Sequence, residues 1–431
     1  MGSLRSSAPD RDLGHLAAKS LGAFGITHLV PPVPPPVPQV DADSLVAFAQ
    51  ELVRVPSVHR PEAGQTEAAA AALVAERMRA FGWTPVVEEA APGRPNVVAV
   101  VEGGLPGPTL LFEGHTDVVT EGDPADWSRD PFGGEIAGGR LYGRGAADMK
   151  GGVAAMLYAA AALAAAGPFP GRLLVAALAD EEGLMLGVKD FVRRGHAAGV
   201  AAAIVCEPEG GEVCVAQKGA IRALVDVRGR MAHGAMPQHG VNPIPPLADV
   251  VRRCRELEAA LQAEAGAHPL LGVPHVTPTL LEAGSPDQLN VIPGHARLGL
   301  DIRTTPAVDH PALLTRLEGL CGESGRLTIV DDRPATETPA RHPLVRALVD
   351  AHEAVRGAPP PLGGVPGATD GTILWRDAGV PIVTYGPGGK WIAHQVDEFV
   401  EVDDLVACAE VYVEAARRFL SVGMDASSAR V

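Results

Sequence analysis

The chain has 431 residues, of which 46% are hydrophobic and 20% charged, the balance of a soluble globular protein. A chain of this length exceeds what one hydrophobic core usually organises, so we expect two domains. The formal net charge of −16 is a poor match for a phosphate backbone or an anionic membrane, so neither a nucleic acid nor a membrane is an expected partner.

The cysteines and the apolar runs of the sequence indicate the cellular compartment in which the protein is expected. The five cysteines are scattered and never spaced as C-x-x-C, which favours a reducing compartment over a disulfide framework. The longest uncharged apolar run, near 153–166, is too short to cross a bilayer, and the N-terminus lacks the apolar segment of a signal peptide. We therefore expect a cytoplasmic protein.

The first half of the chain predicts an α/β domain after a tail. The segment VPPVPPPVP at 30–38 is typical of a polyproline spacer, so residues 1–40 are expected to form a flexible proline-rich tail. Helical spacing then covers 41–57, 66–83, 149–167 and 183–195, and apolar strand runs cover 95–103, 109–114, 172–180 and 201–208. Uniformly apolar strands separated by helices predict a mostly parallel sheet flanked by helices.

The pattern changes near residue 216. Strands are predicted at 220–229, 275–284, 296–305 and 326–332, with helices at 245–264 and 311–324. This β-α-β-β-α-β order is that of a ferredoxin-like domain. We therefore predict an inserted domain at 216–332 between two parts of the larger domain, 41–215 and 333–424, with a short tail at 425–431.

Acids and histidines follow the predicted strands of the larger domain. They are His115 and Asp117, then Glu181 and Glu182, then Glu207, then His394, with Asp148 just before an alanine-rich helix. Functional groups of an open α/β sheet gather beyond the carboxyl ends of its strands. Each residue alone is an ordinary loop residue or helix cap, but together they predict a metal site.

The stretch LLFEGHTDVV (110–119) predicts a more detailed arrangement. Residues i and i+2 of a strand share a face, so Asp117 can accept the second N–H of the His115 ring and orient it toward a metal. The alternative for these two residues alone is a core histidine beside a turn aspartate.

The motifs EGHTDVV, LYGRGAADMKGG, DEEG, CEPEGG, RMAHGAMP, DIR and AHQVDE occur in one order between Asp41 and Leu420. In this the chain resembles the M20 metallopeptidases, which include aminoacylases, acetylornithine deacetylase, succinyl-diaminopimelate desuccinylase and carboxypeptidase G2. The resemblance implies a zinc-peptidase catalytic domain, an inserted lid and dimerisation domain, and a homodimer formed through that inserted domain.

The resemblance also implies two Zn²⁺ ions per subunit, with Co²⁺ or Mn²⁺ as possible substitutes. The implied ligands are His115, Asp148 and Glu207 for one ion, and Asp148, Glu182 and His394 for the other. Three carboxylates against two dications leave a positive charge that favours a bound hydroxide. By the same resemblance Asp117 orients His115 and Glu181 is the general base. An acidic helix N-terminus is the alternative explanation of the DEE segment.

Five further residues are candidates for catalysis or substrate binding. The resemblance implies that His233 stabilises the oxyanion in a partner's active site and that Arg303 binds a substrate carboxylate. Asn290 is an assisting candidate, and Gly367 and Thr369 belong to a glycine-rich turn suited to line a pocket. As alternatives, His233 and Asn290 are turn residues and Arg303 is a surface ion-pair partner.

The sequence thus predicts a di-zinc hydrolase that cleaves the amide bond of an N-acyl amino acid with a free carboxylate. A carboxypeptidase or dipeptidase that acts on short peptides is the second interpretation, because the same chemistry hydrolyses a peptide bond. A catalytically silent binding protein of the same fold is the third interpretation, which a missing metal ligand or a missing general base would favour.

Overall fold

The computed structural model describes residues 38–322 and 325–428. The predicted proline-rich tail, residues 1–40, therefore lies almost wholly outside the described residues. The helix α1 (Ala42–Val53) begins where the helical spacing begins, because the carboxylate of Asp41 accepts a hydrogen bond from the Ser44 backbone N–H at 3.1 Å.

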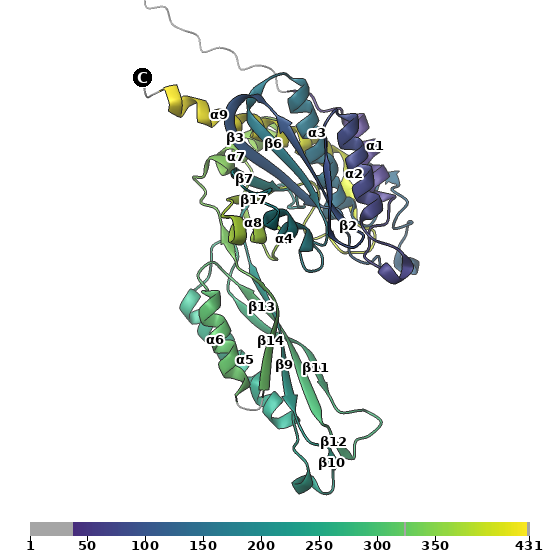
Figure 1. The fold of residues 1–431 in the computed structure, drawn as a ribbon, viewed down its shortest axis with the longest axis vertical. Helices are drawn as coiled ribbons and strands as arrows, with labels where there is room; N and C mark the ends of the chain where they lie inside the picture. Colours follow the sequence, from purple (N-terminus) through teal and green to yellow (C-terminus); the bar gives the residue numbers. More distant parts are fainter. Residues whose placement is uncertain (1–37, 323–324, 429–431) are drawn as a thin grey trace, which may run out of the picture. The chain divides into compact units, whose positions relative to one another are not determined.

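A large mixed sheet forms the centre of the part of the chain outside the inserted segment (Figure 1). Its strand order is β1-β2-β6-β3-β7-β17-β8-β15, and β16 also pairs with β8. The strands are β1 (Val86–Ala91), β2 (Arg94–Glu102), β3 (Gly104–His115), β6 (Phe169–Leu178), β7 (Val200–Val205), β8 (Val213–Gln217), β15 (Thr336–Glu337), β16 (Leu362–Val365) and β17 (Ile382–Thr384).

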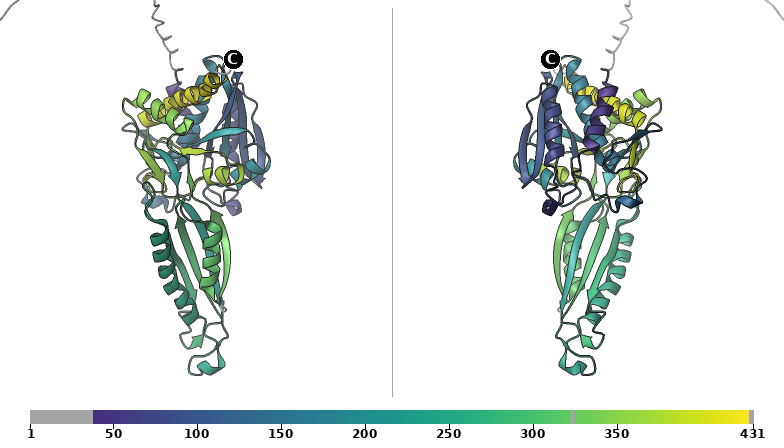
Figure 2. Two further views of the ribbon diagram at one scale, coloured as in Figure 1. Left: turned by 90° about the vertical axis from the view of Figure 1, so that its left-hand side faces the viewer. Right: turned by 90° about the vertical axis from the view of Figure 1, so that its right-hand side faces the viewer.

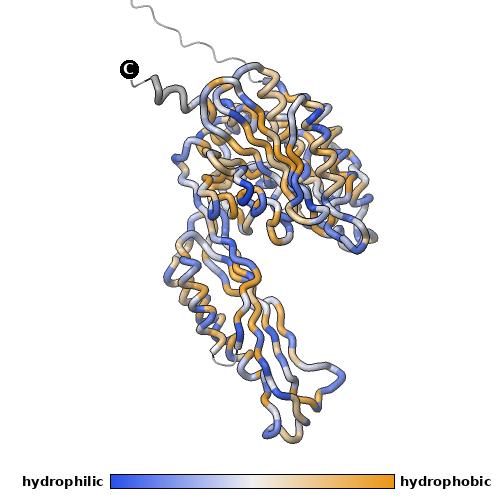
Figure 3. The backbone as a smooth tube through the Cα atoms, viewed as in Figure 1, coloured by the Kyte–Doolittle hydropathy of each residue, from blue (hydrophilic) through white to orange (hydrophobic). Residues whose placement is uncertain are grey.

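The parallel pairing that the sequence predicts occurs at the centre of this sheet. Strand β3 is parallel to both β6 and β7, and β7 is parallel to β17. The pairs β1–β2, β2–β6, β17–β8 and β8–β15 are antiparallel, so the sheet is more mixed than predicted. Figure 3 shows the central strands as hydrophobic along most of their length, as expected for strands that helices cover on both faces.

Helices cover both faces of the sheet. One apolar core joins the sheet to α1, α2 (Ala68–Ala80), α3 (Gly151–Ala165), α7 (Pro343–Arg356) and α9 (Val402–Ser428). The other core joins it to α4 (Leu186–Arg193) and α8 (Gly371–Ala378). The neighbours Leu110 and Leu111 of β3 contribute to different cores, because successive side chains of a strand point to opposite faces.

The predicted C-terminal tail at 425–431 begins within a helix, and its boundary stays a prediction. Helix α9 continues to Ser428, and no proline interrupts it after Val402. Residues 429–431 lie outside the described part of the chain. Within that described part, no helix combines the length and apolar character that a membrane crossing requires.

The inserted segment has the predicted β-α-β-β-α-β order. Its elements are β9 (Gly219–Arg228), α5 (Ile244–Ala265), β11 (His275–Ala283), β13 (His295–Thr304), α6 (His310–Cys321) and β14 (Gly325–Arg333). The strands form an antiparallel sheet of order β11-β13-β9-β14, and α5 and α6 pack on one face of it over a separate apolar core (Figure 2). The domain boundaries at 215/216 and 332/333 stay a prediction.

Candidate metal centre

Three neighbouring strands deliver the first group of site residues. The strands β6, β3 and β7 are adjacent and parallel, so their carboxyl ends meet at one edge of the sheet. Strand β3 ends at His115; Glu181 and Glu182 follow β6, and Glu207 follows β7. All four therefore reach the same edge, as the sequence predicts.

Two loops from distant parts of the chain bring Asp148 and His394 to this edge. His115 Nε2 lies 3.1 Å from Asp148 Oδ1 and 3.4 Å from Glu207 Oε1. On the other side, His394 Nε2 lies 3.2 Å from Asp148 Oδ2 and 2.8 Å from Glu182 Oε1. The two oxygens of one carboxylate thus face two different imidazoles, which defines two donor groups with a shared member.

These donors fit a pair of zinc ions. Zn–N and Zn–O bonds of about 2.0–2.1 Å in tetrahedral geometry put neighbouring donor atoms about 3.3 Å apart. The four distances within the two donor groups lie between 2.8 and 3.4 Å, near this value, and imidazole with carboxylate is a donor set that zinc accepts. A carboxylate that bridges two ions is also what a paired metal site requires.

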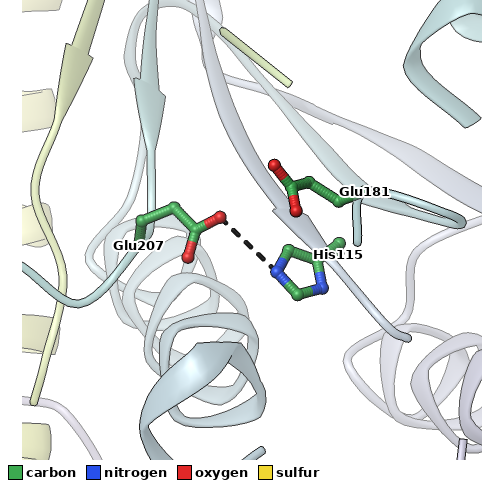
Figure 4. Close-up of side chains that lie close together, drawn as sticks. All are labelled: His115, Glu181 and Glu207. Carbon is green, nitrogen blue, oxygen red and sulfur yellow. Dashed lines mark ion pairs between the residues drawn. The ribbon is translucent and has the colours of Figure 1, made fainter. Parts of the chain in front are cut away.

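Glu181 lies beside the first donor group. Its carboxylate, a nitrogen of His115 and an oxygen of Glu207 lie within 4.8 Å of one another. Figure 4 shows both carboxylates on the same side of the imidazole ring, with Glu207 in ion-pair contact with it. Glu181 thus lies next to the first donor group.

The Asp117 carboxylate lies beside the second ring nitrogen of His115, as the sequence predicts, and the Asp117 backbone contacts the same nitrogen. Strand β3 ends at His115, so this contact does not come from alternation along a strand. The ring Nδ1 lies 3.0 Å from the backbone carbonyl oxygen of Asp117 and 3.5 Å from its carboxylate. The carboxylate accepts the backbone N–H groups of Glu181 and Glu182, both at 3.1 Å, so Asp117 connects His115 to the segment that carries both glutamates.

The ionisable groups are strongly perturbed because they are buried and close together. Burial and the charge of Asp148 raise the pKa of Glu207 to about 8. Hydrogen bonds to Asp148 and Glu182 raise the pKa of His394 to about 10. Burial acts to raise the pKa of Asp148, but the two imidazoles hold it well below its usual range. Perturbation of this size is typical of functional sites, and two dications would compensate the crowded carboxylates.

The sequence did not assign a role to Glu398 or Arg144, which support Asp148 and His394. Glu398 is fully buried and accepts the backbone N–H groups of Ala147 and Asp148 at 3.0 and 3.1 Å. Its other oxygen pairs with Arg144, which also donates to the carbonyl oxygen of His394 at 3.2 Å. Both lie in the quoted motifs, but no local pattern connects positions about 250 residues apart.

A second buried arginine supports the segment of Glu181 and Glu182. Arg94 pairs with the carboxylates of Glu67 and Asp180. Asp180 has a left-handed backbone (φ 66°) and accepts the backbone N–H groups of Leu184 and Leu186. These bonds stabilise the turn after β6, and no pattern in the sequence indicates the contact of Arg94 with Asp180.

A cavity of about 310 Å³ lies next to the candidate metal ligands, and only some of the substrate-binding candidates line it. Arg303, Gly367 and Thr369 line it together with Asp148, Glu181, Glu182, Glu207 and His394. His233 and Asn290 are exposed and do not line it. They lie close together where β10 (Ala232–His233) pairs with β12 (Val291–Ile292).

Comparisons with known proteins identify the family of the chain. Residues 111–418 match the model of peptidase family M20/M25/M40. The chain is also 36% identical over 408 residues to the succinyl-diaminopimelate desuccinylase of Methylobacterium sp. (strain 4-46), with 89% of this chain and 97% of that protein covered. The chain therefore belongs to peptidase family M20/M25/M40, which confirms the resemblance that its motifs predict.

Solved structures share the fold. An M20 family metallo-carboxypeptidase from Sulfolobus solfataricus has a TM-score of 0.74 at 20% identity, with 88% of this chain and 99% of that chain covered. A dinuclear metal binding peptidase of the M20 family from Bacillus subtilis has a TM-score of 0.65 at 16% identity, with 88% and 98% covered. The predicted α/β fold with a large sheet between helices is thereby confirmed.

Proposed function

We propose that this protein is a di-zinc amidohydrolase that cleaves the amide bond of an N-acyl amino acid bearing a free carboxylate. The observation that carries the proposal is the Asp148 carboxylate, which faces His115 with one oxygen and His394 with the other. Sequence identity to a protein named as a desuccinylase supports the acyl amino acid as substrate class.

In this proposal His115, Asp148 and Glu207 would hold one ion, and Asp148, Glu182 and His394 would hold the other. When bound, the ions supply Lewis-acid polarisation of the carbonyl and acidify the attacking water. Co²⁺ and Mn²⁺ accept the same nitrogen and oxygen donors.

Glu181 carries out the proton transfers. Its carboxylate takes a proton from the attacking water while the water oxygen bonds to the amide carbon. The C–N bond then breaks, and Glu181 returns the proton to the leaving amine, so a carboxylate and a free amino acid result. Burial raises the pKa of Glu181 well above its usual value, which suits a group that must hold the proton between the two steps.

Two supporting roles and the assembly belong to the same proposal. Asp117 orients His115 and the Glu181–Glu182 segment, and His233 donates to the oxyanion from a partner subunit, with Asn290 assisting. A homodimer through the inserted segment is supported by its edge strand β11, where Leu280 and Leu281 are exposed. A cytoplasmic location is supported by five free, buried cysteines.

A carboxypeptidase or dipeptidase is the second candidate, favoured by the fold shared with a metallo-carboxypeptidase. A silent binding protein lacks support, because a full donor set and a base candidate are present. Hydrolysis of N-acyl amino acids and of dipeptides by the zinc-loaded protein separates the first two candidates. Glu181→Gln is expected to keep both metals and lose nearly all turnover; turnover equal to that of the wild type would refute its role as base.

A further inference from the structure

Four cationic side chains line the cavity next to the metal-site residues within the described part of the chain: Arg222, Arg303, Arg333 and Lys390. A buried or half-buried cation is usually paired with an acid of its own protein. A cation that is left unpaired at a binding cavity is therefore a candidate to bind an anionic group of the ligand.

Three of the four cations already have partners. Arg303 donates to both carboxylate oxygens of Asp301, at 2.6 and 3.1 Å. Arg333 pairs with Asp331 and donates to the carbonyl oxygen of Gly183 at 2.8 Å. The charge of each guanidinium is thus largely neutralised before any ligand arrives.

Lys390 is paired as well, since its ammonium lies 2.8 Å from Glu212 and 3.1 Å from Glu209. The guanidinium of Arg222, in contrast, makes no hydrogen bond or ion pair with any side chain or backbone group among the described residues. Among the described residues, it is the one cation of this cavity whose side-chain N–H groups have no partner.

The strand register places Arg222 on the cavity side of the inserted sheet. Ala220 of β9 stands opposite Arg303 and Arg333, and residues directly opposite one another share a face. Arg222 is two residues further along β9, so it lies on that same face, about 6.6–6.8 Å beyond this row. It stands between Asp301 and Asp331, each of which already binds another arginine.

We propose that Arg222 binds a second carboxylate of the substrate, away from the scissile amide, and so selects dianionic N-acyl amino acids. The inference rests on the proposed function and names its substrate class. The second carboxylate can end the acyl group or the amino-acid side chain. A planar guanidinium that is free to form two parallel hydrogen bonds is well suited to either.

The test compares matched substrates that differ in this one charge. N-succinyl-alanine is paired with its uncharged isostere N-succinamoyl-alanine, and N-acetyl-glutamate with N-acetyl-glutamine; kcat/KM is measured for each. The wild type is expected to prefer the charged member of at least one pair, and the pair that shows the preference identifies which end Arg222 binds. Arg222→Gln is expected to reduce that preference about tenfold to a hundredfold, the range for hydrogen bonds to a charged group. Arg222→Lys, which keeps the charge, is expected to restore part of it.

Arg228→Gln is the matched control. Arg228 ends the same strand, is exposed, and does not line the cavity. This variant is expected to keep the wild-type preference. A preference that is equal in the wild type and in Arg222→Gln, or one lost equally in the Arg228 variant, would overturn the proposal.

A binding measurement separates this inference from the proposed function. Calorimetric titration with glutarate, and with its monoamide as the uncharged control, needs no turnover. Glutarate is expected to bind Arg222→Gln at least tenfold more weakly than the wild type. If the protein hydrolyses none of the four substrates, the proposed function fails, and the glutarate titration still decides for or against Arg222.

Discussion

The Asp148 carboxylate lies between two imidazole rings, with Oδ1 3.1 Å from His115 Nε2 and Oδ2 3.2 Å from His394 Nε2. The three residues come from the end of β3, the segment before α3 and the segment after β17. One side chain thus connects two donor groups that are far apart in the sequence. The account of this protein as a dinuclear enzyme depends on this contact.

The shared position of Asp148 predicts a difference in metal stoichiometry. Removal of His394 takes a ligand from one ion, whereas removal of Asp148 takes a ligand from both. We expect His394→Ala to retain about one metal per subunit and Asp148→Ala to retain almost none. Elemental analysis after dialysis measures this. Equal metal content in the two variants would show that Asp148 is not shared.

Substitution of Glu398, which is not a candidate metal ligand, is expected to change both metal affinity and stability. Glu398→Gln removes the charge that is paired with Arg144 and weakens the hold on the Asp148 backbone. We expect metal affinity to fall about 10- to 100-fold, the usual effect of losing a partner of a metal ligand. We also expect unfolding free energy to fall by about 3–5 kcal/mol, because a buried arginine loses its partner.

Two further variants control this experiment. Glu401→Gln lies nearby but changes an exposed carboxylate, so it is expected to leave metal affinity unchanged. The double variant Arg144→Gln/Glu398→Gln removes both buried charges and is expected to recover part of the stability. Competition with a chelator measures affinity and urea denaturation measures stability. Wild-type affinity in Glu398→Gln would contradict the supporting role.

The metal-free protein is predicted to lose stability as the pH rises. The pKa of His394 is about 10 in the fold against 6.5, so its contribution is complete below about pH 6.5 and is lost as the pH approaches 10. The pKa of Glu207 is about 8 against 4.5, so deprotonation between these values also costs folding energy. Both effects lower the stability as the pH rises, that of Glu207 between about pH 4.5 and 8 and that of His394 between about pH 6.5 and 10.

Zinc is expected to oppose this trend, because it binds the deprotonated ligands and its affinity therefore rises with pH. We expect the Tm measured with EDTA to fall from about pH 6 to about pH 9, and the gain in Tm on adding zinc to grow over the same range. Differential scanning fluorimetry checks both. A Tm in EDTA that rises across this range would contradict the crowded donor cluster.

The sequence predicted those parts of the fold and site that local patterns encode. The apolar runs of β3, β6 and β7 and the acids after them place His115, Glu181, Glu182 and Glu207 at one edge, because parallel strands share their carboxyl ends. The antiparallel strands at both sides of the sheet were not predicted, since hydrophobicity specifies burial and not strand direction.

Contacts between distant segments could not be predicted from the sequence. Arg94 pairs with Asp180 across 86 residues and Arg144 with Glu398 across 254, and neither pair leaves a periodic signal. Asp117 shows a related limit: strand β3 stops at His115, so two-residue alternation does not predict the additional contact between the Asp117 backbone carbonyl oxygen and the ring. The free Arg222 is visible only once the partners of its neighbouring cations are known.

Anomalous X-ray diffraction at the zinc edge, on crystals of the zinc-loaded protein, tests the central claim most directly. The account predicts two anomalous peaks about 3.5–4 Å apart, one on each side of the Asp148 carboxylate. A single peak, or peaks that do not contact Asp148, would contradict it.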